Sequence, residues 1–571
     1  MSLGPRPDRR LLLRTASVGL VAGAAAACAR IPTESQTSSR PLALQEQPGA
    51  PYVRALPPAD DATPAEVVAG FVQAGVGSED DFAVARAYLT DQAQAAWNPG
   101  AGITVYSGSE ETRVQDDGDG AFSLVLRVTA LIDERGVRSL LPAPATREIA
   151  VQVVEQDGQH RLDEVPDGIF LSEAAFETLY ASARLYFLDA RRRHLVPDLR
   201  WFALRQIAAD VLRGLADGPS PTLADAVINQ IPSSTSMGAA AISTGADGTV
   251  QVAVPPAITS LSTVSRYQAL SQIEASLRSV RTLSGVRLVQ EETELMLEEE
   301  HRMERALPGH RPIAAGERGI ISLSSPSGDA PPTQLVPALA ETAVADPIIA
   351  QDGVLAAALE PQRAVVLIAS TDDSIEVREA ATGDAFVPPS IDDAGWVWTA
   401  TVSNAGALLA LSGRASEEDA KVDATWLHGR SVTCLALAAD ATRMLVLSSD
   451  DGQARLDVCA VVRNADGVPT SLGEPTPIHT ELTDLSWAGW YDELAVLVLG
   501  TDATSGTQRA LVVDLVTGAD PLPALPDGVR RVAGSVIAET AWVGIRGDQL
   551  LRSDGENWSA VDITGRDPAF Y

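Results

Sequence analysis

The chain contains three cysteines, and their surroundings predict different chemistry. Cys28 ends the stretch SVGLVAGAAAAC, in which small and apolar residues lead directly to the sulfur. A cysteine thiolate is a good nucleophile, so this sulfur is a candidate for attachment of a lipid group. Cys434 and Cys459 lie far along the chain in alternating apolar stretches, where we expect β-strands rather than a reactive site.

The residues before Cys28 predict export from the cytoplasm. A positively charged start precedes an apolar run that is shorter than the roughly 20 residues needed to span a bilayer. This order predicts a signal peptide over residues 1–27, with an ordinary buried helix as the alternative. The small residues before the cysteine resemble a bacterial lipobox, although Ala25 stands where leucine is usual. DRRLLLRT also resembles a twin-arginine signal, so the export route stays open.

A lipobox predicts that Cys28 becomes the first residue of the mature chain, carrying N-acyl (palmitate) and S-diacylglycerol groups. Each buried CH₂ contributes about 0.8 kcal/mol, and a single acyl chain binds a bilayer only marginally. Two or three chains hold a protein stably. We therefore expect lipid anchoring at the extracytoplasmic face of the cell membrane.

Familiar catalytic frameworks are absent from the sequence. It contains no G-x-S-x-G, H-E-x-x-H or G-x-G-x-x-G motif. Lys421 is the only lysine, and Ala420 precedes it where a P-loop requires glycine. We expect no enzyme activity, no metal and no cofactor.

The histidines are scattered, and one pair lies closer together than the rest. His301 and His310 lie in a segment that also holds Glu299, Glu300 and Glu304, so a metal site is one interpretation. The neighbouring run EETELMLEEE favours a solvated charged segment instead. The histidines are His160, His194, His301, His310, His428 and His479.

Two further patterns favour structural roles. DDGDG at residues 116–120 lacks the spaced ligands of a calcium loop and predicts a hairpin turn. Cys434 and Cys459 are predicted on the first and third strands of one sheet, about 10 Å apart. A disulfide requires Cα atoms within about 7 Å, so we expect two buried thiols, with a disulfide as the alternative.

Basic and aromatic residues supply the remaining candidates for binding. Arg191, Arg192 and Arg193 form a basic turn in an acidic chain and are a candidate contact for a partner, with a solvated hairpin tip as the alternative. The tryptophans of the carboxy-terminal half favour packing between strands, with a sugar- or partner-binding face as the alternative. They are Trp396, Trp398, Trp426, Trp487, Trp490 and Trp542.

The composition limits the partners. The 571 residues carry a formal net charge of −33, and 45% are hydrophobic, which is enough for several cores. An acidic surface repels phosphate groups, which argues against nucleic acid and against electrostatic binding to anionic lipid. Contact with a membrane must therefore come through lipid.

The order of segments predicts a multidomain protein. Residues 28–62 begin with the lipidated cysteine, are rich in Pro, Ser, Gln and Thr, and predict a flexible tether. Residues 63–180 predict an α+β domain. Its first helix opens with Thr63 and Glu66 in capping-box spacing, a second helix covers DDFAVARAYLTDQAQAAW, and antiparallel strands follow.

The rest of the chain predicts two further domains. Residues 181–290 predict an α/β domain, in which two strands flank the basic turn and a helix stops at Gly218. Residues 291–313 predict a charged connector. Residues 314–571 repeat short strands and polar turns every roughly 40–50 residues, which is typical of propeller blades. We expect an all-β propeller of five or six blades, with a large β-sandwich as the alternative.

The order of these parts resembles the actinobacterial lipoprotein LpqB family over essentially the whole chain. The middle unit, with LYFLDARRRHLVPDLRW and VLRGLADGPSPTLADAVINQIPSST, looks like a GerMN domain. The resemblance implies a cell-envelope lipoprotein that associates with the extracellular domain of an MtrB-type sensor histidine kinase. It implies modulation of the MtrA–MtrB two-component system, with effects on cell division and envelope homeostasis. Of the binding residues, only Cys28 carries over.

The leading hypothesis is therefore a non-enzymatic accessory protein that regulates a sensor kinase. Two alternatives remain: an enzyme with its site in the propeller channel, and a protein that binds cell-wall glycans or small ligands. Carboxylates and histidines converging in the channel would favour the enzyme. An uncharged channel and a broad apolar patch outside it would favour a protein partner.

Overall fold

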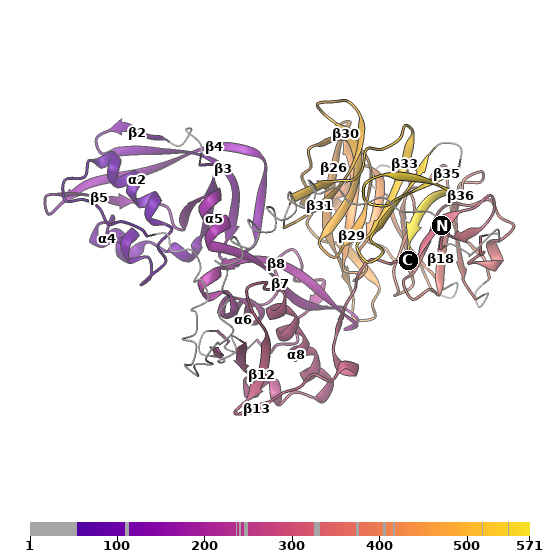
Figure 1. The fold of residues 1–571 in the computed structure, drawn as a ribbon, viewed down its shortest axis with the longest axis horizontal. Coiled ribbons are helices and arrows are strands. Elements are labelled where there is room, and N and C mark those ends of the chain that lie inside the picture. Colours follow the sequence, from indigo (N-terminus) through magenta and orange to yellow (C-terminus); the bar gives the residue numbers. More distant parts are fainter. Residues whose placement is uncertain are drawn as a thin grey trace, which may run out of the picture. The chain divides into compact units, whose positions relative to one another are not determined.

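The computed structural model describes residues 54–571, apart from residues 109–112, 234, 236, 239–240, 245–248, 325–331, 373–375, 403–406, 415–416, 517 and 546–547. Figure 1 shows the helices and strands that these residues form. Among them, no helix combines the length and the apolar character that crossing a bilayer requires.

Helix α2 (Pro64–Ala74) begins as the sequence predicts. The side chain of Thr63 accepts a hydrogen bond from the Glu66 N–H, and the Glu66 carboxylate accepts one from the Thr63 N–H at 2.8 Å. This reciprocal pair is the predicted capping box. Val67 and Phe71 lie on the buried face of the helix, and Figure 1 shows α2 lying along the neighbouring sheet.

The prediction of a single second helix is wrong. The structure has two short helices instead, α3 (Ala83–Arg86) and α4 (Asp91–Ala96). Between them Leu89 forms a β-bridge with Leu162, which takes the backbone out of helical geometry. The side chain of Thr90 then caps the start of α4, so a tertiary contact and a local cap together split the helix.

The first sheet has six strands in the order β5-β4-β3-β1-β6, with β2 paired to β3. Asp119 and Gly120, with φ of 54° and 79°, join β2 to β3, which confirms the hairpin turn at DDGDG. The sheet and the first three helices share one buried core, so this region is α+β. The strands are β1 (Gly102–Tyr106), β2 (Arg113–Gly118), β3 (Ala121–Asp133), β4 (Arg138–Gln156), β5 (Gln159–Glu164) and β6 (Ile169–Ser172).

The middle region has the predicted α/β character. Strands β7 (Tyr180–Asp189) and β8 (His194–Ala203) form an antiparallel pair joined by the basic turn. Helix α6 (Ile207–Asp217) ends at Gly218, whose φ of 91° only glycine adopts readily. Figure 1 shows α6 and α8 near β7 and β8. The other elements are α5 (Glu173–Leu179), β9 (Val227–Ile228), β10 (Ile242–Thr244), β11 (Val250–Ala253), α7 (Pro256–Thr259), α8 (Thr263–Arg278) and β12 (Val286–Gln290).

The chain from 291 to 313 adds strands to both sheets of the middle region. Strand β13 (Thr293–Glu294) pairs with β12, and β14 (Glu304–Arg305) pairs with β8. The two sheets have the orders β10-β11-β12-β13 and β14-β8-β7-β9. The predicted connector is therefore tied into the middle region by backbone hydrogen bonds.

The carboxy-terminal region forms six sheets, each of three to five described strands. Their innermost strands β17, β21, β24, β29, β33 and β37 contact one another in a closed ring. Strand β37 pairs with β15, so the last strand completes the blade that holds the first. The region is thus a β-propeller with six blades in its described residues, and the β-sandwich alternative is wrong.

The propeller strands have the following bounds. The first three sheets contain β15 (Pro312–Ala315), β16 (Ile320–Ser322) and β37 (Arg566–Phe570); β17 (Ala345–Ile349), β18 (Leu355–Glu360), β19 (Val365–Ser370) and β20 (Arg378–Thr382); β21 (Ser390–Ile391), β22 (Trp396–Ala400) and β23 (Leu408–Ser412). The other three contain β24 (Ser431–Leu437), β25 (Arg443–Asp450), β26 (Gln453–Arg463), β27 (Pro469–Leu472) and β28 (Thr476–Pro477); β29 (Leu482–Asp492), β30 (Ala495–Asp502), β31 (Gln508–Asp514) and β32 (Gly518–Pro521); β33 (Val529–Ser535), β34 (Thr540–Ile545), β35 (Gln549–Ser553) and β36 (Trp558–Thr564).

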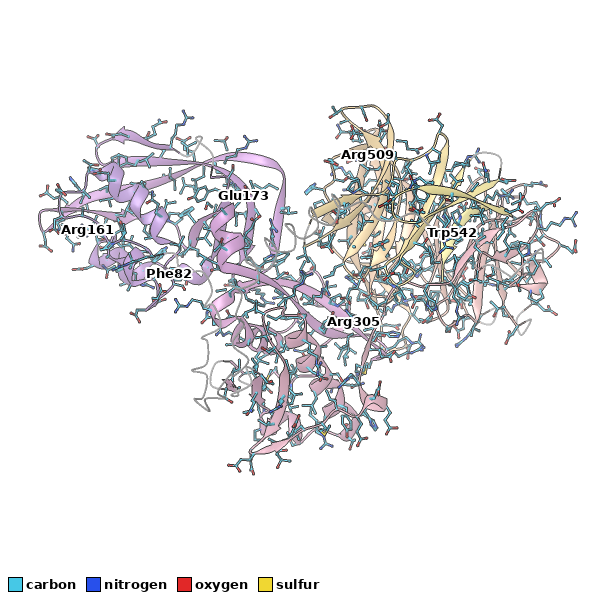
Figure 2. All side chains as sticks on the ribbon, in the orientation of Figure 1. Phe82, Arg161, Glu173, Arg305, Arg509 and Trp542 are labelled. Carbon is cyan, nitrogen blue, oxygen red and sulfur yellow. The ribbon has the colours of Figure 1, made fainter. Side chains whose placement is uncertain are left out.

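Cysteines and tryptophans pack into these blades. Cys434 on β24 and Cys459 on β26 are separated by β25 and are free and buried, so the prediction of two buried thiols is confirmed. Burial raises the pKa of Cys434 to about 11, which keeps the thiol protonated at neutral pH. Trp398 and Trp542 are buried in the blades, as predicted, and Figure 2 shows Trp542 among the propeller strands.

Candidate functional site

Of the two candidate sites from the sequence, the structure describes the basic turn but not the lipid site. Cys28 lies outside the described residues, so its lipidation stays a prediction. The turn of Arg191, Arg192 and Arg193 lies between β7 and β8, and all three arginines are exposed.

One buried carboxylate sets the conformation of the basic turn. Asp189 accepts hydrogen bonds from the backbone N–H groups of Arg191 at 3.1 Å, Arg193 at 2.6 Å and His194 at 2.6 Å. Arg192 has a φ of 54°, in the left-handed region that residues other than glycine seldom adopt. The turn is therefore held in one shape by Asp189, with its cationic side chains displayed outward.

One arginine of the turn binds the propeller. Arg191 Nη1 donates a hydrogen bond to the backbone oxygen of Asp393 at 2.8 Å. Burial, and then the charge of Asp352, raise the pKa of the Asp393 carboxyl, while Arg193 and His194 lower it. The basic turn therefore lies against a propeller loop, and Arg192 and Arg193 keep exposed side chains there.

A second contact between this hairpin and the propeller is buried and charged. Glu493 follows β29 and its side chain is only 1% exposed. Its Oε1 accepts a hydrogen bond from Tyr186 Oη at 2.9 Å. The same oxygen lies 3.0 Å from Arg184 Nη1 and 3.1 Å from Arg305 Nη1. Arg305 belongs to β14 (Figure 2), so both β7 and β14 converge on one propeller carboxylate.

Burial sets the protonation state of Tyr186 in this Glu493 cluster. The pKa of Tyr186 is raised to about 12, first by burial and then by the charge of Glu493, so the phenol stays protonated and donates. A buried carboxylate is costly unless cations and donors surround it, and here Arg184, Arg305 and Tyr186 do so. We infer that the Glu493 cluster holds the middle region against the propeller.

The sequence gives little indication of the Glu493 cluster. Tyr186 and Glu493 are separated by 307 positions. Glu493 stands in the turn YDEL between two strands, where an acidic residue is expected to be solvated. The one sequence feature that could have indicated the cluster is on β7. There Arg184 and Tyr186 are two positions apart and therefore share one face of the strand.

Only some of the candidate metal residues lie together. His301 Nδ1 lies 3.4 Å from Glu298 Oε2 and 3.6 Å from Glu300 Oε1, and all three residues are exposed. The His301 ring also stacks on Tyr267, with 4.6 Å between ring centres. His310, Glu299 and Glu304 are not part of the group. An exposed trio on one short segment fits the solvated charged segment that the sequence favours.

The inner strands of the propeller surround a cavity of about 150 Å³. Arg531 on β33 lines it, with Nη1 2.6 Å from Asp346 Oδ1 and the guanidinium carbon 4.2 Å from the ring centre of Trp487. Asp392 also lines the cavity but is paired with Arg463. The described lining contains no histidine, and its carboxylates are those of Asp392 and Asp393.

A larger cleft, of about 830 Å³, lies beside α6. Two of its arginines have acidic partners: Arg213 Nη1 lies 2.7 Å from Asp210 Oδ1, and Arg205 is paired with Glu79, whereas Arg135 Nη1 donates to the backbone oxygen of Pro219 at 3.2 Å. Burial raises the pKa of Tyr180, which also lines the cleft, to about 12. The cleft is therefore lined by charged residues, several of which are joined in ion pairs.

Comparison with known families identifies both ends of the described chain. The model for "Lipoprotein LpqB, N-terminal domain" matches residues 57–177, and the model for "Lipoprotein LpqB beta-propeller domain" matches residues 323–570. Together they cover more than half of the chain.

Two curated relatives match over nearly their full length. Lipoprotein LpqB of Streptomyces avermitilis is 26% identical over 610 residues, covering 98% of this chain and 98% of that protein. Lipoprotein LpqB of Streptomyces coelicolor is 26% identical over 618 residues, covering 97% of each. Among solved structures, a chain of a nidogen/laminin complex aligns with 45% of this chain and 97% of its own length at 10% identity, with a TM-score of 0.33, which is too low to infer a shared fold.

The protein is a multidomain protein in which an α+β region and an α/β region precede a β-propeller, with a charged contact between the last two. Both family models and the full-length relatives bear one family name. The chain belongs to the lipoprotein LpqB family.

Proposed function

We propose that this protein is an extracytoplasmic lipoprotein, anchored through Cys28, that acts without enzymatic activity as an accessory to an MtrB-type sensor kinase. In this role it binds the kinase's external domain and modulates the MtrA–MtrB system, and through it cell division and envelope homeostasis. Family membership supports the lipoprotein part of this proposal.

The observation that carries the partner proposal is the fixed basic turn. A net charge of −33 repels acidic partners over most of the surface. Arg192 and Arg193 are exposed on a turn whose backbone Asp189 holds in place. A preorganised cationic tip costs little entropy to bind, and it suits an acidic patch on the partner.

A pull-down from envelope membranes tests this proposal. Wild-type protein is expected to recover the kinase's external domain under mild crosslinking. The double variant Arg192→Glu/Arg193→Glu is expected to recover at least tenfold less, because two attractive charges become repulsive. The matched control Arg113→Glu/Arg147→Glu changes the net charge equally at exposed arginines of the first sheet, and recovery should be unchanged. Equal loss in both variants, or no recovery by wild type, would contradict the proposed contact.

The anchor is tested separately. Cys28→Ala should leave the membrane fraction after a salt wash, because the acidic body has no other membrane contact in this proposal. Retention of Cys28→Ala on the membrane would show that something other than acyl chains holds the protein.

A further inference from the structure

Residues 298–305, here called the strap, contact one face of helix α8. The helix contributes Tyr267, Ser271 and Glu274, which are four and then three positions apart and therefore lie on one face. At the first of these positions the ring of His301 stacks on Tyr267, with 4.6 Å between ring centres. The helix thus offers the strap three attachment points along one face.

The other two attachments are polar. Arg302 Nε lies 3.3 Å from Glu274 Oε2, and the side chain of Glu274 is only 11% exposed. The Met303 N–H donates a hydrogen bond to Ser271 Oγ at 3.1 Å. An ion pair to a largely buried carboxylate is screened less by solvent than a fully exposed pair. Removal of either contact should therefore loosen the strap from the helix.

The inner end of the strap supplies one partner of Glu493 and packs against another. Arg305 Nη1 lies 3.1 Å from Glu493 Oε1 (Figure 2). The side chain of Met303 packs against the buried cluster that contains Tyr186. Tyr186 Oη donates to the same carboxylate oxygen at 2.9 Å. The position of the strap therefore affects two of the three groups that surround Glu493 Oε1.

The strap is more exposed than the elements that it joins. Every residue of the strap except Met303 is exposed. Its strand β14 has two residues, and it pairs with β8 only at His194 and Leu195. Short, exposed elements open at a lower free energy than core strands and helices. The strap is therefore expected to detach before the sheets around it unfold.

We propose that residues 298–305 are a releasable strap. While the strap is attached to α8, it holds Tyr186 and Arg305 in place for Glu493. When the strap detaches, both groups are loosened and the middle region is held less firmly against the propeller. Ser271 and Glu274 are then positioning residues, because they lie on α8 and act on Glu493 through the strap. This inference does not depend on the proposed kinase contact.

Trypsin reports whether the strap is attached, because it cleaves after arginine and the strap contains Arg302 and Arg305. The experiment uses the full chain in detergent micelles, with cleavage sites and rates followed by mass spectrometry. Ser271→Ala and Glu274→Gln each remove one attachment, and each should speed cleavage at these two arginines about threefold to tenfold. Cleavage after Arg509, on a propeller strand, should not change.

Two matched controls accompany these variants. Ser265→Ala changes a serine of the same helix whose hydroxyl accepts from Ser262 Oγ at 3.1 Å. Glu291→Gln removes an exposed carboxylate outside the strap. Neither control should change the cleavage rate. Unchanged cleavage at the strap in both Ser271→Ala and Glu274→Gln, or equal acceleration after Arg509, would overturn the proposal.

A double-mutant cycle tests whether the two ends of the strap are coupled. Glu493→Gln removes the charged partner of Arg305 and should also speed cleavage at the strap. In Glu274→Gln/Glu493→Gln the acceleration should be smaller than the product of the two single accelerations, because loss of either contact already weakens the other. All rates must stay well below that of the unfolded chain. An acceleration equal to the product would show independent contacts and would overturn the positioning role of Glu274.

Discussion

The Glu493 cluster and the propeller cavity differ in how many partners surround a buried charged group. At Glu493, one carboxylate oxygen takes contacts from Tyr186, Arg184 and Arg305. Beside the cavity, Arg531 Nη1 pairs with Asp346 Oδ1, whereas Arg531 Nε has no partner among the described residues. Glu493 Oε2 is likewise buried without a partner, so the difference lies in the paired atoms: three donors surround Glu493 Oε1, whereas one carboxylate pairs with Arg531 Nη1. We therefore expect stability to depend more on the charge at Glu493 than on the groups beside the cavity.

The largest effect is expected from neutralising the Glu493 cluster. Glu493→Gln leaves two arginines facing an uncharged amide, and should lower the free energy of unfolding by about 3 kcal/mol. This is the lower end of the usual range, because Arg184 and Arg305 are partly exposed. Urea unfolding measures the loss. Glu481→Gln, at an exposed glutamate of the same propeller, should change it by less than about 0.5 kcal/mol. Equal free energies of unfolding for the two variants would show that the cluster does not stabilise the fold.

The next effect concerns the turn beside the cluster. Asp189→Ala removes the acceptor of three backbone N–H groups and should lower the free energy of unfolding by about 2 kcal/mol. Hydrogen exchange at Arg193 and His194 should rise in the same variant. If exchange there stays slow, the Asp189 carboxylate does not fix the turn.

Alkaline pH probes the Tyr186 hydroxyl of the cluster. The pKa of Tyr186 rises from 10.0 to about 12 on folding, so the folded protein keeps a proton that the unfolded chain releases. Stability contributed by Tyr186 is therefore complete below pH 10 and is lost as the pH rises to about 12, by roughly 2 kcal/mol. Tyr186→Phe should show a shallower decline over this range in unfolding experiments. Tyr180, whose pKa is also raised to about 12, remains in that variant, so part of the decline should persist. Identical slopes would contradict the burial of the Tyr186 proton.

The smallest effect is expected in the cavity. Because Trp487 Nε1 has no protein partner, Trp487→Phe removes no hydrogen bond and should change the free energy of unfolding by less than about 1 kcal/mol. This small change contrasts with Glu493→Gln and can be measured in the same urea series. A loss of unfolding free energy as large as that of Glu493→Gln would show that the two sites contribute equally to stability and would contradict this prediction.

Features set by neighbouring residues could be predicted from the sequence. The capping box needs only Thr63 and Glu66, and the DDGDG turn needs only residues that tolerate positive φ. The positions of Cys434 and Cys459 follow from strand order within one blade. In each case the physical cause lies within a few residues or one sheet.

Features set by distant contacts could not be predicted. The second helix is split because Leu89 pairs with Leu162, and the two residues are far apart in the sequence. Glu493 has the appearance of an exposed turn residue until Tyr186 is placed beside it. The unpaired donors of Arg531 and Trp487 are likewise visible only when the inner strands surround a cavity.

A photo-crosslinking amino acid at position 192 tests the central claim of a partner at the basic turn most directly. In envelope membranes, the protein with the crosslinker in place of Arg192 is expected to form a covalent adduct with the external domain of the sensor kinase. The same crosslinker in place of Arg113, on the first sheet, should form none. Adducts of equal yield from both positions, or none from position 192 when both proteins reach the membrane, would contradict the account.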